Sequence, residues 1–178
     1  MSQSYEIDMC HGPLFGKIIR FSIPLMLSGI LQLLFNAADI IVVGRFVGST
    51  ALAAVGSTSS LINLLINLFI GFSVGANVLV ARFHGAGRDD EVNETVHTAI
   101  TLSMVSGIFL LILGVTVTRT LLIWMGSPDD VLDQSSLYLK IYFLAMPATL
   151  LYNFGSSILR AVGDTKRPLF YLMTAGVI

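Results

Sequence analysis

The chain has 178 residues, of which 54% are hydrophobic and only 12% are charged, and its formal net charge is −1. Soluble domains carry about 25% charged residues, so this chain cannot cover itself with polar surface and the lipid bilayer is its expected solvent. The ten Lys and Arg are dispersed, which gives no indication of nucleic-acid binding. Cys10 is the single cysteine, which excludes an intrachain disulfide and a Cys-based metal site.

Four segments are long and apolar enough to cross the hydrocarbon core as helices, which takes about 20 residues. They lie at about 18–43, 52–80, 96–123 and 137–161. A fifth apolar segment begins at Pro168 and reaches Ile178 without a polar exit, so we expect a part of a longer protein. The predicted fold is an all-α membrane protein, with a polytopic helical bundle over 17–178 that follows a cytoplasmic amino-terminal segment over 1–16.

The orientation follows from the loops between these segments. Seven of the ten Lys and Arg fall on one side of the membrane segments and three on the other. The seven are Lys17, Arg20, Arg82, Arg88, Arg160, Lys166 and Arg167. Cytoplasmic loops carry the excess of Lys and Arg, so we expect a multi-pass protein of the plasma membrane with a cytoplasmic amino terminus. Trp124 and Tyr138, which flank the loop at 125–136, are expected at the outer interface.

The first predicted segment carries a polar stripe. Gln32, Asn36 and Asp39 are four and three residues apart, so they share one helix face. Asp39 is the only acidic residue within a predicted segment, and a mid-helix Asp costs roughly 2.5–3.5 kcal/mol to insert. It is either an outer-end carboxylate that snorkels or pairs with Arg45, or a protonatable group that binds a proton or cation on one side and releases it on the other. We favour the second interpretation.

Two further segments have a polar face of their own. Asn63 and Asn67 lie one turn apart in the second segment, and Tyr142, Thr149 and Asn153 lie in the fourth. Polar residues at helix contacts also hold membrane bundles together, at about 0.6 kcal/mol per hydrogen bond. These residues are therefore candidates for the lining of a cavity, with helix packing as the alternative.

Two prolines lie inside predicted membrane segments, Pro24 in the first and Pro147 in the fourth. Proline removes a backbone hydrogen bond, so we expect a kink at each position. Such kinks occur in the moving helices of transporters, although prolines are also ordinary in transmembrane helices.

The sequence does not predict an enzyme. An intramembrane aspartyl protease needs two carboxylates at one depth, whereas Asp39 is expected toward the outer side and Asp164 at the cytoplasmic surface. The predicted segments contain no Ser/His pair and no His/Glu metal motif. We therefore expect neither a catalytic site nor a cofactor.

Four stretches of the sequence resemble the multidrug and toxic compound extrusion (MATE) transporters, in particular their bacterial branch. They are FSIPLM (21–26), FNAADIIVVGRFVGSTALAAVG (35–56), GFSVGANVLVARFHGAGR (71–88) and LRAVGDTKRP (159–168). The resemblance covers nearly the whole chain from about Gly12, although the family often has Gln where this chain has Arg82. It implies a twelve-helix protein of two six-helix lobes, of which this chain supplies the first four helices and part of the fifth, without the carboxy-terminal lobe.

The resemblance also implies a function. Members of the family export cationic or amphiphilic compounds from the cell in exchange for H⁺ or Na⁺, by alternating access across the inner membrane of bacteria. Asp39 matches the family's helix-one carboxylate, to which coupling is attributed, so a Na⁺ site near Asp39 is an alternative to a proton. Asn153 falls near a polar position of helix four in the same cavity.

The expected partners are small cationic or amphiphilic molecules and the lipid bilayer. Two alternatives stay open at this point. One is a lipid-linked oligosaccharide flippase of the same superfamily, a class that often has several cationic residues in its cavity, whereas this chain has none deep in its predicted segments. The other is a truncated membrane fragment that transports nothing.

Overall fold

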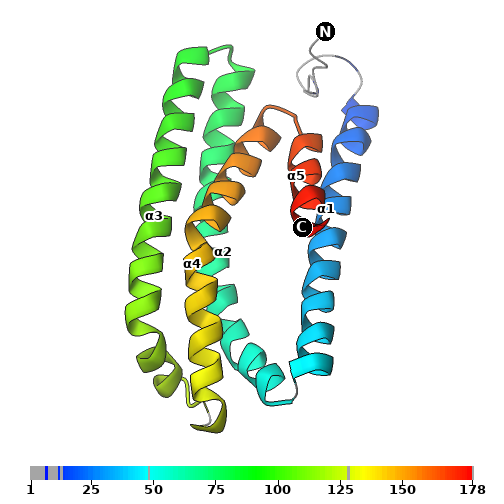
Figure 1. Cartoon of the computed structure of the whole chain (residues 1–178). Coiled ribbons are helices and arrows are strands. Elements are labelled where there is room, and N and C mark those ends of the chain that lie inside the picture. Colours follow the sequence, from blue (N-terminus) through cyan, green and yellow to red (C-terminus); the bar gives the residue numbers. More distant parts are fainter. Residues whose placement is uncertain (1–6, 8–11, 13, 48, 128, 178) are drawn as a thin grey trace.

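The described part of the chain is helical apart from its turns, which confirms the predicted all-α fold (Figure 1). The computed structural model describes residues 7, 12, 14–47, 49–127 and 129–177. Its elements are α1 (Leu14–Val42), the π-helical turn η1 (Val43–Val47), α2 (Ser49–Gly85), α3 (Asp89–Trp124), α4 (Asp129–Ala161) and α5 (Lys166–Val177). The four long helices run alternately up and down, so their connections gather at the two ends of the bundle (Figure 1).

Each of the four predicted membrane segments lies within this helical framework, and the helices extend beyond most of the predicted ends. Three helical stretches are long and apolar enough to cross a membrane, namely Leu14–Phe46, Leu61–Gly85 and Asp89–Trp124. Since α1 begins at Leu14, the last residues of the predicted segment 1–16 are helical, and most of its other residues lie outside the described part.

The fourth predicted segment lies in α4, which is not one of the three apolar stretches. Its position in the bundle explains the difference, because α4 packs against both α2 and α3. Five side chains on one face of α4 are buried: Leu139, Phe143, Met146, Leu150 and Phe154. A helix surrounded by other helices meets less lipid, so it can carry Lys140 and Asn153 at a lower hydropathy. Its crossing of the membrane stays a prediction.

Helices α3 and α4 approach each other closely along a row of small residues on α3. A Cβ atom added at Gly107 would lie 2.6 Å from the Cα atom of Pro147, and one added at Gly114 would overlap the ring of Phe143. Ser103 on the same face is fully buried. Small residues let membrane helices pack with their backbones in contact, so this row fixes the position of α4 against α3.

Helix α1 packs differently from the other long helices. Among the described elements its main contacts are with α5 and η1, and a Cβ atom at Gly176 of α5 would overlap the ring of Phe35. Figure 1 shows α1 and α5 side by side, apart from the group formed by α2, α3 and α4. The pair formed by α1 and α5 therefore faces the group formed by α2, α3 and α4.

The two prolines lie within continuous helices, Pro24 in α1 and Pro147 in α4. In α1, Ser28 Oγ donates a hydrogen bond to the carbonyl oxygen of Pro24 at 2.9 Å. Figure 1 shows that α4 bends along its length. A kink caused by either proline stays a prediction.

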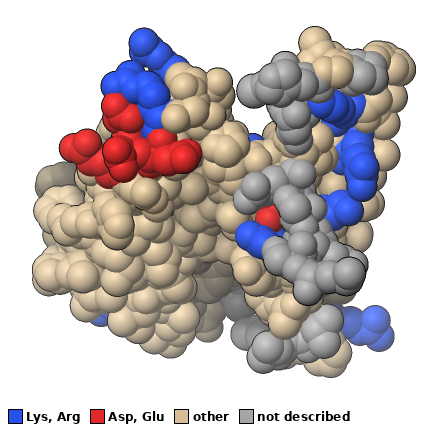
Figure 2. Space-filling view, turned by 90° about the horizontal axis from the view of Figure 1, so that it is seen from above, with Lys and Arg blue, Asp and Glu red and all other residues tan. Residues whose placement is uncertain are grey.

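The end of the bundle that we predict to be cytoplasmic has its charges divided into two groups. Figure 2, which views this end, shows acidic side chains gathered on one side and most of the Lys and Arg on the other. The acidic group lies at the start of α3 and comprises Asp89, Asp90, Glu91 and Glu94.

Candidate functional site

A cavity of about 720 Å³ lies between α1 on one side and α2 and α4 on the other. Five of the eight residues proposed from the sequence for ion coupling or cavity lining line it: Gln32, Asn36, Asp39, Asn63 and Tyr142. Apolar side chains such as Leu33 and Ile62 form much of the rest of its wall. The structure thus brings polar residues from three helices to one hollow that carries a single carboxylate among its described lining residues.

The stripe on α1 forms one wall of this cavity. Gln32, Asn36 and Asp39 are all exposed there, as their common helix face requires. No ion pair joins Asp39 to Arg45, which lies in η1 and is also exposed. Pairing with Arg45 therefore does not account for Asp39, and the cavity supplies the polar surroundings that an intramembrane carboxylate requires.

The opposite wall contains a residue that was not proposed for the cavity from the sequence. Tyr138 is half-buried and lines the cavity one turn before Tyr142, while its location at the outer interface stays a prediction. Their spacing of four residues on α4 was the available signal. Ser59 of α2 also lines the cavity, while its Oγ donates a hydrogen bond to the carbonyl oxygen of Val55 at 2.7 Å.

Three proposed residues are not among those that line the cavity: Asn67, Thr149 and Asn153. Asn67 is exposed, and its Nδ2 donates a hydrogen bond to the carbonyl oxygen of Asn63 at 2.7 Å. Thr149 Oγ1 donates to the carbonyl oxygen of Ala145 at 3.0 Å, within its own helix. Asn153 is half-buried on α4, about three turns beyond Tyr142. These residues lie too far around or along their helices to reach this hollow.

A polar contact between α2 and α4 was also missed from the sequence. Asn77 Nδ2 donates a hydrogen bond to the carbonyl oxygen of Ser157 at 2.6 Å, and Ser157 Oγ donates to the carbonyl oxygen of Ser73 at 2.9 Å. Ser73 and Ser157 are both buried. Hydrogen bonds of this kind join membrane helices, so this contact holds together the two helices that form one wall of the cavity.

Comparison with known proteins identifies the family. The MatE family model matches residues 24–178. The probable multidrug resistance protein YoeA of Bacillus subtilis (strain 168) is 35% identical over 158 residues, which are 89% of this chain and 34% of that protein. The FAD transporter of Shewanella oneidensis is 26% identical over 167 residues, which are 93% of this chain and 36% of that protein.

Solved structures agree in fold. A crystal structure of a MATE mutant superposes with a TM-score of 0.88 and 25% sequence identity, over 99% of this chain and 39% of that chain. This chain spans about a third of the length of the curated relatives it matches. It contains the first helices of the MATE fold, and with a family match over most of its residues the chain belongs to the MatE family of multi-pass membrane proteins.

Proposed function

We propose that this chain forms part of the amino-terminal lobe of a cation- or proton-coupled antiporter that exports cationic or amphiphilic compounds, with Asp39 as the ion-coupling carboxylate. The observation that carries the proposal is the position of Asp39 in a cavity of about 720 Å³, beside Asn36 and opposite Tyr142. Relatives named as multidrug resistance or multidrug export proteins support the transport of small molecules.

The charge of the cavity bears on the class of substrate. One relative is named as a FAD transporter, so membership of the family does not by itself select cations. Asp39 is the only charged side chain among the described lining residues. An ionised carboxylate in a confined cavity attracts cations, and this favours an exporter of cations over the flippase, whose lipid phosphates would require Lys or Arg.

The mechanism that we infer is competition at Asp39. The ionised carboxylate favours a cationic substrate, whereas a bound proton or Na⁺ neutralises the site and lowers the affinity for that substrate. Exchange then follows if the neutralised and the substrate-bound states prefer different conformations, because a ligand shifts an equilibrium only by its differential affinity for the two states. The neighbouring amides of Gln32 and Asn36 supply oxygen atoms for a cation or a protonated substrate.

Dye export from cells tests the proposal. We compare Asp39→Asn with Asp133→Asn, which removes the same charge from an exposed carboxylate that pairs with Arg119 at 3.0 Å outside the cavity. With the chain expressed as part of the whole antiporter, Asp39→Asn is expected to reduce ethidium export to the level of cells without the protein, and Asp133→Asn to leave it unchanged. Both proteins are quantified in the membrane fraction.

Two further outcomes of the same assay are informative. Export by Asp39→Asn at the wild-type rate would refute the coupling role. A whole wild-type protein that inserts in the membrane but moves no dye would support the non-transporting alternative instead. Replacement of Na⁺ by K⁺ in the assay medium distinguishes the coupling ions, because only a Na⁺-coupled protein loses export.

A further inference from the structure

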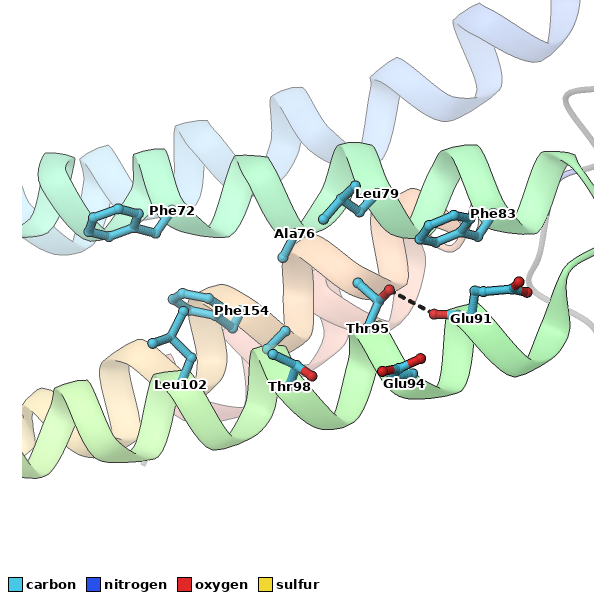
Figure 3. A pocket seen from close by; sticks show the side chains of 11 residues that line it. Phe72, Ala76, Leu79, Phe83, Glu91, Glu94, Thr95, Thr98, Leu102 and Phe154 are labelled. Atoms are coloured by element: carbon cyan, nitrogen blue, oxygen red, sulfur yellow. Dashed lines mark hydrogen bonds between the residues drawn. The ribbon is translucent and has the colours of Figure 1, made fainter.

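A second cavity, of about 370 Å³, lies between α2 and α3 and shares no lining residue with the cavity around Asp39. Figure 3 shows that Phe72 and Leu79 of α2, Leu102 of α3 and Phe154 of α4 line the cavity. Its volume falls in the range of about 300–1,000 Å³ that is usual for small-molecule sites. We refer to it as the α2–α3 groove.

The α2–α3 groove changes in character along its length. Phe72 and Leu102 make one end apolar, whereas Glu91 and Glu94 lie at the other end, near the turn between α2 and α3 (Figure 3). Thr95 lies beside them. The apolar end of the groove therefore lies at the depth predicted for the hydrocarbon core of the membrane, and the carboxylates lie at the predicted cytoplasmic surface.

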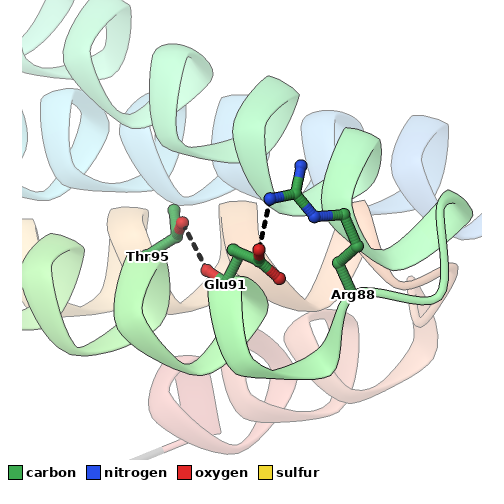
Figure 4. A network of polar contacts seen from close by, with 3 residues as sticks. All are labelled: Arg88, Glu91 and Thr95. Atoms are coloured by element: carbon green, nitrogen blue, oxygen red, sulfur yellow. Dashed lines mark hydrogen bonds and ion pairs between the residues drawn. The ribbon is translucent and has the colours of Figure 1, made fainter.

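Arg88 shows how a positively charged group can bind at the polar end of the groove. The guanidinium of Arg88 lies 5.2 Å from the centroid of the Phe83 ring and forms an ion pair with Glu91 (Figure 4). Phe83 and Glu91 both line the α2–α3 groove. An aromatic face combined with a carboxylate is a favourable environment for an organic cation.

Arg88 alone does not neutralise the carboxylates at the polar end of the groove. Glu94 is exposed and has no ion pair among the described residues, and Asp89 and Asp90 lie close by at the start of α3. Figure 2 shows these carboxylates as one acidic area, with basic side chains along one border. Acidic residues in the first turn of a helix also stabilise the helix dipole, and that role accounts for Asp89, Asp90 and Glu91 but not for Glu94. Only Glu91 and Glu94 line the groove.

We propose that the α2–α3 groove docks an amphiphilic organic cation, with its apolar body between α2 and α3 and its cationic group at Glu91 and Glu94. The acidic residues repel an anionic lipid headgroup. A small inorganic cation has no apolar part to contact the apolar wall of the groove. The inference deepens the proposed function, since it gives the same class of substrate a docking place at the predicted cytoplasmic leaflet. Binding is measured without transport, so the two proposals fail independently.

Fluorescence quenching tests the docking. The chain contains a single tryptophan, so Trp124→Phe combined with Phe72→Trp places the only reporter in the α2–α3 groove. The protein is reconstituted in phosphatidylcholine vesicles and titrated with a long-chain alkyl trimethylammonium that carries bromine on its chain. A probe with the same brominated chain and a sulfate head serves for comparison.

A matched pair of double variants identifies the role of the carboxylates. Glu91→Gln/Glu94→Gln is expected to raise the half-quenching concentration of the cationic probe about tenfold, which corresponds to about 1.4 kcal/mol. Asp89→Asn/Asp90→Asn removes the same charge outside the groove and is expected to change it less than about twofold. Ala76→Phe fills the groove and is expected to abolish saturable quenching.

Four results would overturn the proposal. An equal shift in both double variants would show a general surface-charge effect, and equal quenching by the sulfate probe would show a groove filled by lipid chains of any kind. Undiminished quenching in Ala76→Phe would show that the probe binds elsewhere. Absence of saturable quenching in the Trp124→Phe/Phe72→Trp protein with an otherwise unchanged groove, while that protein still exports ethidium, would refute the groove and leave the proposed function intact.

Discussion

Asn63 and Asn67 lie one turn apart on α2, yet their side chains have different surroundings. Asn63 lines the cavity with Asp39, while Asn67 is exposed and its Nδ2 donates a hydrogen bond to the carbonyl oxygen of Asn63 within its helix. Four residues advance an α-helix by one turn and roughly 40°. That rotation is sufficient to move a side chain from the edge of the cavity to a different face.

This pair gives a matched prediction. Asn63→Ala removes a polar group from the cavity wall and is expected to reduce ethidium export severalfold, because the hydrogen-bonding capacity of the site is lost. Asn67→Ala removes a bond within one helix and is expected to leave export within about twofold of wild type. Equal export by the two variants would show that the cavity boundary is misplaced.

Much of the candidate site could be predicted from single residues. Gln32, Asn36 and Asp39 were assigned to one face because helical spacing is set by the backbone alone, and the structure places them together. Thr149 could not be judged in the same way, because its surroundings depend on how α4 packs against its neighbours. Tyr138 was not proposed for the cavity, since tyrosine is common both at interfaces and in cavities.

Glycine residues of α3 determine how closely this helix packs against α4. Gly114 accepts the ring of Phe143 against its backbone, whereas Gly71 of α2 has nothing within 4 Å of an added Cβ atom. The two glycines are alike in sequence, both lying in the middle of long apolar helices. Their neighbours make them structurally different.

Alanine substitutions at these two glycines test the packing. Gly114→Ala is expected to destabilise the protein by about 1–3 kcal/mol, the usual cost of overpacking. Gly71→Ala is expected to be neutral or stabilising by up to about 1 kcal/mol, because alanine is the better helix former. Thermal unfolding followed by Trp124 fluorescence measures both, and a Gly114→Ala protein as stable as Gly71→Ala would contradict the close approach of α3 and α4.

The existence of the helices followed from hydropathy, but their limits and contacts did not. Helix α3 begins at Asp89, seven residues before the predicted segment at 96–123, because a helix can continue beyond the hydrocarbon where its residues are polar. The hydrogen bonds from Asn77 and Ser157 between α2 and α4 depend on tertiary packing, which a pattern within one helix does not reveal.

At the scale of the whole molecule, α1 and α5 form one group of helices and α2, α3 and α4 another. The cavity around Asp39 lies between them, lined by α1 on one side and by α2 and α4 on the other. The sequence predicted that polar faces would meet, and the family resemblance predicted the lobe. Which helices pair was decided by contacts such as that of Gly176 with Phe35.

The central claim is that Asp39 binds cations in this cavity when it is ionised and releases them when it is neutralised. Binding of a fluorescent cationic dye to the purified chain, measured by polarisation, tests it directly, because Asp39→Asn keeps the shape of the side chain and removes its charge. We expect the wild-type chain and Asp133→Asn, which removes a carboxylate outside the cavity, to bind the dye severalfold more tightly than Asp39→Asn. Equal binding by Asp39→Asn and the wild type would contradict the claim.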